Sequence, residues 1–185
     1  MVMLAGVSLP RPEYNKMMKD LIAALKANGP RIKPKVRLLY TGGHADNPEF
    51  FDLLQQNDAH VVSDNTGFGT RAADVLIRED GDPLEAIIDY YFEEKPAATR
   101  QMGTQVERME RLLDLVKQYK ADGVVASRLY MCDLWAFEHF LMRKRLHENN
   151  VPFLELEVDY TPEGQGQIKT RVQAFVESLA DRQTA

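Results

Sequence analysis

The chain has 185 residues, the size of one domain, and this length is enough to bury a substantial core. Its 23 basic and 28 acidic residues are well mixed and leave a formal net charge of −5, which argues against a nucleic-acid-binding protein. The single cysteine excludes a disulfide framework and a metal site of four thiolates from this chain, and it fits a reducing compartment.

No apolar run approaches the ~20 residues that a transmembrane helix needs. The first eight residues are too short and too uncharged for a signal peptide. The sequence therefore predicts a cytoplasmic protein that does not act at a membrane.

The spacing of apolar residues predicts the elements in chain order. Met17, Met18, Leu21 and Leu25 repeat at helical spacing and indicate a first helix. Runs of branched apolar residues indicate four strands, at Val36–Thr41, His60–Asp64, Gly123–Ser127 and Val151–Val158. Further helices are expected from Pro48 to Gln56, from Pro83 to about Phe92, from Val106 to Tyr119, from Asp133 to Asn149 and from Pro162 onward.

Three dipeptides give the helix starts, because Asn47, Asp82 and Thr161 each precede a proline and are predicted N-caps. The stretch Glu93–Gly103 has weak periodicity and predicts a long loop. Strands that alternate with helices predict a single α/β domain over residues 1–185. We expect three α-β-α layers around a mainly parallel sheet of about four strands.

The fourth strand alternates leucines with Glu155 and Glu157, so it is predicted either to lie at the sheet edge or to turn its polar face toward a site. We expect Glu157 to form a structural ion pair with Arg171 of the last helix. Glu138 and His139, adjacent within a helix, are interpreted as a solvated or packed pair rather than as ligands.

Groups suited to a ligand site follow the strands. Gly42, Asp64, Cys132 and Asp159 each come after a strand, and the carboxyl ends of parallel strands share one edge of a sheet. Arg71 adds a cation after the flexible Gly67-Phe68-Gly69 turn and is expected to bind an anionic part of a substrate. Taken singly, each loop is also ordinary turn chemistry.

Cys132 stands between the third strand and the helix that begins at Asp133. A helix N-terminus favours a thiolate, which can act as a metal ligand or a nucleophile, whereas the alternative is a small buried apolar side chain. The phosphate-loop signature is missing, and Gly67-x-Gly69 lacks the third glycine of a dinucleotide fingerprint. The four histidines are scattered, which makes a mononuclear zinc site improbable.

Several blocks in one order resemble the C-terminal half of subunits of the 2-hydroxyacyl-CoA dehydratase family, which includes the ATP-dependent benzoyl-CoA reductases. Upstream, Val36 to Gly42, Val61 to Asp64 and Gly69 to Arg71 fit the same pattern, so the resemblance covers the chain from about Lys16 onward. The C-terminal blocks are Ala121 to Val125, Cys132-Asp-Leu-Trp-Ala-Phe-Glu138, Val151 to Tyr160 and Gln167 to Glu177.

The resemblance implies an anaerobic, cytoplasmic enzyme part. Family members receive single electrons from an ATP-hydrolysing iron–sulfur activator and carry a 4Fe–4S cluster beside the acyl-CoA thioester. They act as lyases that dehydrate or as oxidoreductases that reduce an aromatic ring. Cys132 matches the last cluster cysteine of the family. Gly42, Asp64, Arg71 and Asp159 are the expected substrate-binding residues.

The chain also departs from the family, because full subunits are longer and their other cluster cysteines lie in an N-terminal half. Where many members carry a cysteine after the proline near Pro96, Ala97 and Ala98 follow. We expect either the C-terminal piece of a subunit, or a half that meets an N-terminal half or second subunit supplying the remaining cluster ligands, or a remnant without a cluster. The alternative function is a non-catalytic assembly or binding module of the same fold in which Cys132 belongs to the core.

Overall fold

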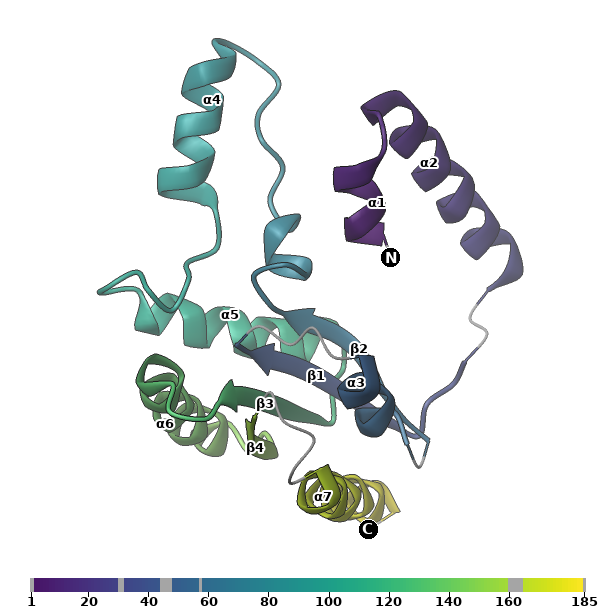
Figure 1. Cartoon of the computed structure of the whole chain (residues 1–185), viewed down its shortest axis with the longest axis vertical. Coiled ribbons are helices and arrows are strands. Elements are labelled where there is room, and N and C mark those ends of the chain that lie inside the picture. Colours follow the sequence, from purple (N-terminus) through teal and green to yellow (C-terminus); the bar gives the residue numbers. More distant parts are fainter. Residues whose placement is uncertain (1, 30–31, 44–47, 57, 160–164, 185) are drawn as a thin grey trace. The chain divides into compact units, whose positions relative to one another are not determined.

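The computed structural model describes residues 2–29, 32–43, 48–56, 58–159 and 165–184 (Figure 1). Contacts divide the chain into two compact units, residues 1–34 and 35–185. The first unit holds helices α1 (Val2–Ser8) and α2 (Arg11–Asn28), so the helix expected around Met17 to Leu25 is confirmed. Neither helix buries a residue.

The second unit contains the sheet, and its strands lie close to the predicted runs. They are β1 (Val36–Gly42), β2 (Ala59–Asn65), β3 (Gly123–Leu129) and β4 (Phe153–Val158). All neighbouring pairs are parallel and the order is β2-β1-β3-β4. The expected mainly parallel sheet of four strands is therefore confirmed, and β4 lies at an edge.

The helices of the second unit also follow the predicted spans. They are α3 (Pro48–Leu54), α4 (Pro83–Asp89), α5 (Gln105–Gln118), α6 (Asp133–Glu148) and α7 (Gln165–Thr184). Asp82 caps α4 as expected, because its side chain accepts hydrogen bonds from the backbone N–H groups of Leu84 and Glu85. The expected caps Asn47 and Thr161 lie outside the described residues.

Two short helical pieces were not predicted as such. One is a 3-10 turn, η1 (Thr70–Ala72). The other is a π-helical turn, η2 (Tyr90–Glu94), which directly continues α4. The predicted loop therefore begins after Glu94, and the backbone reaches α5 without another helix or strand.

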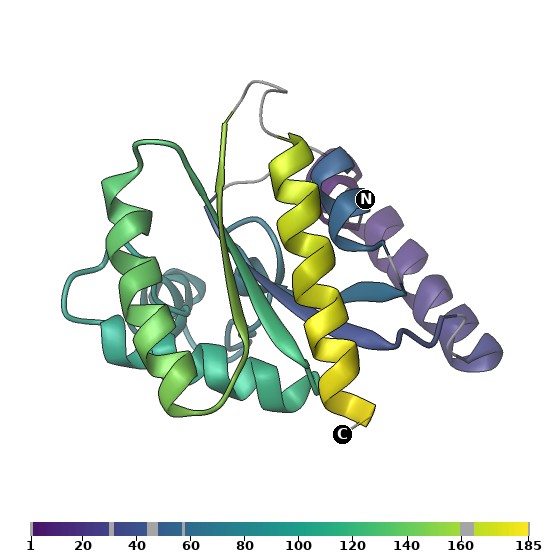
Figure 2. The ribbon, with the colours of Figure 1, turned by 90° about the horizontal axis from the view of Figure 1, so that it is seen from below.

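Two apolar clusters make the three layers. On one face, β1 and β4 pack against α3 and α7 through Leu54, Val172 and Val176. On the other face, Leu39 and Val124 pack against α5 and α6. Figure 2 shows the sheet between α5 and α6 on one side and α7 on the other, so the expected α-β-α fold is confirmed.

The ion pair expected between Glu157 and Arg171 is wrong. Glu157 pairs instead with Arg128 of β3, with 2.5 Å between the carboxylate and guanidinium atoms. Arg171 donates to the backbone carbonyl of Glu155 at 2.6 Å. The reason is the strand period of two: Leu154 and Leu156 face α7, so the glutamates between them point away from it.

Glu138 and His139 prove to be packed. Their side chains are 3% and 0% exposed. None of the helices in the described part of the chain combines the length and apolar character that crossing a membrane requires.

Candidate functional site

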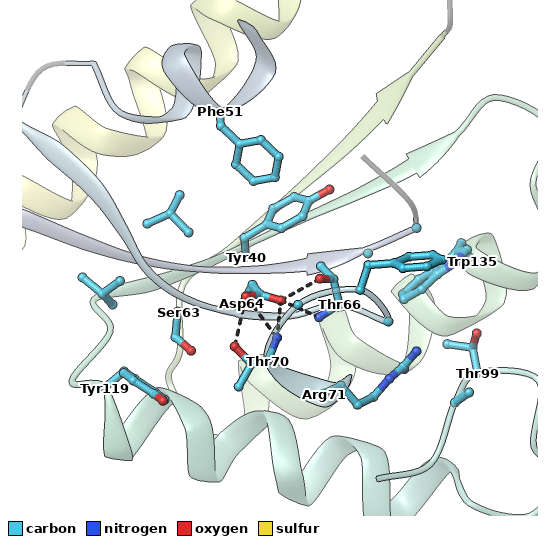
Figure 3. Close-up of a pocket in the computed structure, with 18 of the residues that line it drawn as sticks. Tyr40, Phe51, Ser63, Asp64, Thr66, Thr70, Arg71, Thr99, Tyr119 and Trp135 are labelled. Carbon is cyan, nitrogen blue, oxygen red and sulfur yellow. Dashed lines mark hydrogen bonds between the residues drawn. The ribbon is translucent and has the colours of Figure 1, made fainter. Parts of the chain in front are cut away.

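A pocket of about 780 Å³ opens at the carboxyl edge of the sheet, beside the ends of β1 and β2. The strand ends, the loop that leads into η1, residues 98–100 and the first turn of α6 form its walls (Figure 3). Parallel α/β sheets place ligands at this edge. Three of the predicted site residues, Gly42, Asp64 and Arg71, line the pocket together.

Asp64 organises the loop that forms one wall. Its Oδ1 accepts hydrogen bonds from the Thr66 N–H at 2.9 Å, the Thr66 hydroxyl at 2.6 Å and the Thr70 N–H at 3.1 Å, and its Oδ2 accepts from the Thr70 hydroxyl at 3.0 Å (Figure 3). A Cβ at Gly69 would lie 1.9 Å from Asp64 Oδ1, so only glycine fits there. The carboxylate thus shapes the pocket wall, and its contact with a substrate stays a prediction.

Gly42 has a packing reason of its own. Its φ is 137°, and an added Cβ would lie 2.2 Å from the backbone oxygen of Ser127 in β3. The next residue, Gly43, donates its N–H to the same oxygen at 2.9 Å. The glycine at 42 is therefore required by the close approach of β1 to β3, whether or not a ligand also approaches it.

Arg71 is the charged group of the pocket that has no partner. Of the described residues, none makes a hydrogen bond or ion pair with its guanidinium. Burial lowers the pKa of Arg71, and the nearby cations Arg111 and Arg108 lower it further. Arg71 also lines an adjoining hollow of about 230 Å³, together with Lys95. A partly buried, uncompensated guanidinium at the junction of two hollows is suited to an anionic ligand.

The two neighbouring arginines are already neutralised. Arg108 is buried and forms a bidentate pair with Glu138, with both N–O distances at 2.8 Å. Its remaining nitrogen donates to the carbonyls of Ala98 and Gln101 in the pocket loop. Arg111 pairs with Asp74 at 2.5 Å. The excess positive charge of this cluster therefore lies on Arg71.

Two hydroxyl groups meet beneath the pocket, which the sequence did not predict. The Tyr40 hydroxyl of β1 and the Ser127 hydroxyl of β3 lie 2.5 Å apart and both are buried. Burial raises the pKa of Tyr40 to about 12, and Asp64 adds to this while the hydrogen bond to Ser127 opposes it. The Tyr40 phenol is therefore neutral and fixed under physiological conditions.

Cys132 occupies the N-cap position of α6. The chain reaches it through Met131 with a positive φ of 61°, and the thiol-bearing residue is partly exposed rather than part of either core cluster. One turn further, Trp135 lines the pocket, whereas Cys132 is not among the described lining residues. Nowhere in the described ranges do three His, Cys, Asp or Glu residues gather as a metal site would require.

Asp159 lies at the same edge of the sheet but at its other end. It follows β4, and β1 and β3 separate that strand from β2. At the usual strand spacing, the ends of β2 and β4 are about 14 Å apart. The structure thus brings together Gly42, Asp64 and Arg71, and places Asp159 apart from them.

The structure so far defines a three-layer α/β domain with a polar, arginine-bearing pocket at the carboxyl edge of its sheet. The chain belongs to the family described as 2-hydroxyglutaryl-CoA dehydratase, D-component, whose model matches residues 1–179. This agrees with the resemblance seen in the sequence blocks.

Known proteins of this family include several subunits of larger enzymes. A protein of Escherichia coli (strain K12) that carries the name of a dehydratase subunit is 30% identical over 156 residues, 82% of this chain and 39% of its own. The (R)-phenyllactyl-CoA dehydratase beta subunit of Clostridium sporogenes is 24% identical, across 96% of this chain and 47% of its own. A benzoyl-CoA reductase subunit of Thauera aromatica is 22% identical, across 97% and 47%.

This chain therefore spans less than half the length of the curated relatives it matches.

Proposed function

We propose that this chain is part of an iron–sulfur acyl-CoA dehydratase or benzoyl-CoA reductase subunit. In this proposal Cys132 is one ligand of a 4Fe–4S cluster, and the pocket at the carboxyl edge forms part of the acyl-CoA site. The observation that carries the proposal is the family match over residues 1–179, together with relatives named for acyl-CoA dehydration and benzoyl-CoA reduction.

The position of Cys132 supports its role as a ligand. Its side chain is partly exposed at the first turn of a long helix, where a thiolate is stabilised by the helix dipole and accessible to a metal. Partial exposure also weighs against the alternative, an assembly module in which Cys132 only fills the core. The bound cluster would supply the low-potential electron that reduces the thioester.

One thiolate cannot hold such a cluster, because 4Fe–4S clusters are bound by several cysteines. The remaining ligands must come from outside this chain, from an N-terminal half or a second subunit of the same family. An ATP-dependent iron–sulfur activator is the proposed electron donor. The relatives named as beta subunits make a partner subunit plausible.

Arg71 is proposed to bind an anionic part of the acyl-CoA. Its guanidinium has no partner among the described residues and faces a pocket of about 780 Å³, wide enough for part of a large ligand. Coenzyme A is rich in phosphate, and arginine binds phosphate through its fork of N–H donors.

Substitution of Cys132 tests the proposal. In the complete enzyme, Cys132→Ser should lose the cluster's iron and its broad visible absorption, together with most turnover. Ser127→Ala, at a buried hydroxyl of β3, is a control that leaves every thiol in place and should retain the iron. Anaerobic reconstitution of this chain alone should give little bound iron. If Cys132→Ser keeps both iron content and turnover, the assembly-module alternative replaces this proposal.

A further inference from the structure

The outer edge of β4 is open in the described part of the chain. The strand order ends at β4, and β3 is the only described strand that pairs with it. An open edge presents a row of backbone N–H and C=O groups that can pair with another chain. Proteins usually cover or block such an edge, so its surroundings in this fold are informative.

The hydrogen bonds to β3 show which residues of β4 point outward. The N–H of Val124 donates to the Pro152 carbonyl, and the N–H of Tyr130 donates to the Val158 carbonyl, both at 2.9 Å. Backbone groups alternate between the two sides of a strand, so the even-numbered residues face β3. The N–H and C=O groups of Phe153, Glu155 and Glu157 therefore point away from the sheet.

This open edge is the floor of a groove of about 510 Å³. Residues of α6 and α7 form its two walls, and Figure 2 shows β4 running between these helices. Three arginines line the groove, Arg143 from α6 and Arg171 and Arg182 from α7, against the single carboxylate of Glu155. The groove is thus basic in a chain whose formal net charge is −5.

Two of these arginines are engaged at the edge itself. Arg143 forms an ion pair with Glu155, and Arg171 donates to the outward Glu155 carbonyl at 2.6 Å. Arg182 is exposed, and none of the described residues pairs with it. The outward N–H groups of β4 and the charge of Arg182 are therefore available to a ligand.

We propose that this groove binds an extended, acidic peptide segment of a partner protein, which adds a fifth strand to the sheet along β4. Backbone pairing with Phe153, Glu155 and Glu157 supplies the affinity, and the arginine walls select acidic side chains. A second copy of this chain fits poorly, because a two-fold interface pairs a surface with itself and would set arginine against arginine. The proposal is independent of the chemistry assigned to the pocket at the carboxyl edge.

A synthetic peptide tests the charge requirement. The probe is a labelled octapeptide of alternating threonine and glutamate with blocked ends, and its binding to the full chain is measured by fluorescence anisotropy. We expect saturable binding that weakens as salt is added. The same peptide with lysine in place of glutamate should not bind. Arg182→Glu should weaken binding at least about fivefold, whereas the matched charge reversal Lys169→Glu, on α7 outside the groove, should change it by less than about twofold.

Two further measurements test the strand itself. Amide hydrogen exchange should slow at Phe153, Glu155 and Glu157 when the peptide is bound, whereas Leu154 and Leu156 are protected in both states. A peptide methylated at every backbone nitrogen keeps its charges and should no longer bind.

The proposal is overturned by absent saturable binding, by equal binding of the methylated peptide, which would show a simple anion site, or by dimerisation of the chain alone that protects the odd-numbered amides.

Discussion

At the scale of single residues, Arg71 and its neighbours show how similar side chains take different roles. Arg108 and Arg111 have carboxylate partners and stabilise the fold. Arg71 lies beside them without a partner among the described residues, and both arginines lower its pKa. A guanidinium held in this way costs free energy in the absence of a ligand, which is common at binding sites.

This difference predicts opposite effects on stability. Arg71→Met should leave the free energy of unfolding unchanged or raise it by up to about 1 kcal/mol, because it removes repulsion and a poorly solvated charge. Arg111→Met should lower it by about 1–2 kcal/mol, because Asp74 loses its partner. Urea unfolding of the chain measures both. In the complete enzyme, Arg71→Ala should raise KM for the acyl-CoA. A large loss of stability in Arg71→Met would identify a structural arginine instead.

At the scale of elements, α5 and α6 are joined by two arginine–glutamate pairs that differ in burial. Arg108 and Glu138 are 10% and 3% exposed, whereas Arg145 and Glu110 are 41% and 48% exposed. The buried pair also holds the pocket loop through the carbonyls of Ala98 and Gln101.

The buried pair should behave non-additively. Glu138→Leu should lower the free energy of unfolding by about 3–5 kcal/mol, because it leaves the buried Arg108 charge unpaired. The double variant Arg108→Met with Glu138→Leu should be more stable than that single variant, since no charge is then left buried. Glu110→Leu, the matched change in the exposed pair, should cost less than about 1 kcal/mol. Equal losses at Glu138 and Glu110 in urea unfolding would contradict this account.

The elements were largely predictable from sequence because their signals are local. Continuous apolar runs place β1 and β3 within two residues of their observed ends, and Asp82 before a proline gives the start of α4. The site was less predictable because its contacts are distant in sequence: Arg108 and Glu138 are 30 residues apart. A glutamate on the buried side of a helix is the only local sign of such a pair. The π-helical turn η2 likewise carries no local signal that we can identify.

At the scale of the whole molecule, the edge position of β4 determines where its glutamates go. The sequence left two alternatives for their polar face, an edge or a site. The structure shows the edge, where Glu155 and Glu157 meet Arg128 and Arg143. This charged layer is closed on the inside by His139, which is fully buried and has its Nδ1 3.4 Å from Glu155 Oε1.

His139 makes the stability of the folded unit depend on pH. Burial lowers its pKa below the ordinary 6.5, and the positive charges of Arg128 and Arg143 act in the same direction, while Glu155 opposes them. Because the folded state then binds fewer protons than the unfolded state, the stabilising effect is complete above about pH 6.5 and is lost as the pH falls below it. The free energy of unfolding should therefore decrease between pH 7.5 and pH 5.5, by at most about 1.4 kcal/mol per pH unit from this one group.

A comparison of two histidine variants of α6 isolates this contribution. His139→Leu removes the buried imidazole, so its unfolding free energy should change less between pH 7.5 and pH 5.5 than that of the original chain, whatever its absolute stability. His147→Leu removes an exposed histidine from the same helix and should keep the original pH dependence. Urea unfolding at both pH values gives the two slopes. If His139→Leu retains the full pH dependence, other groups control it and the buried imidazole does not couple protonation to folding.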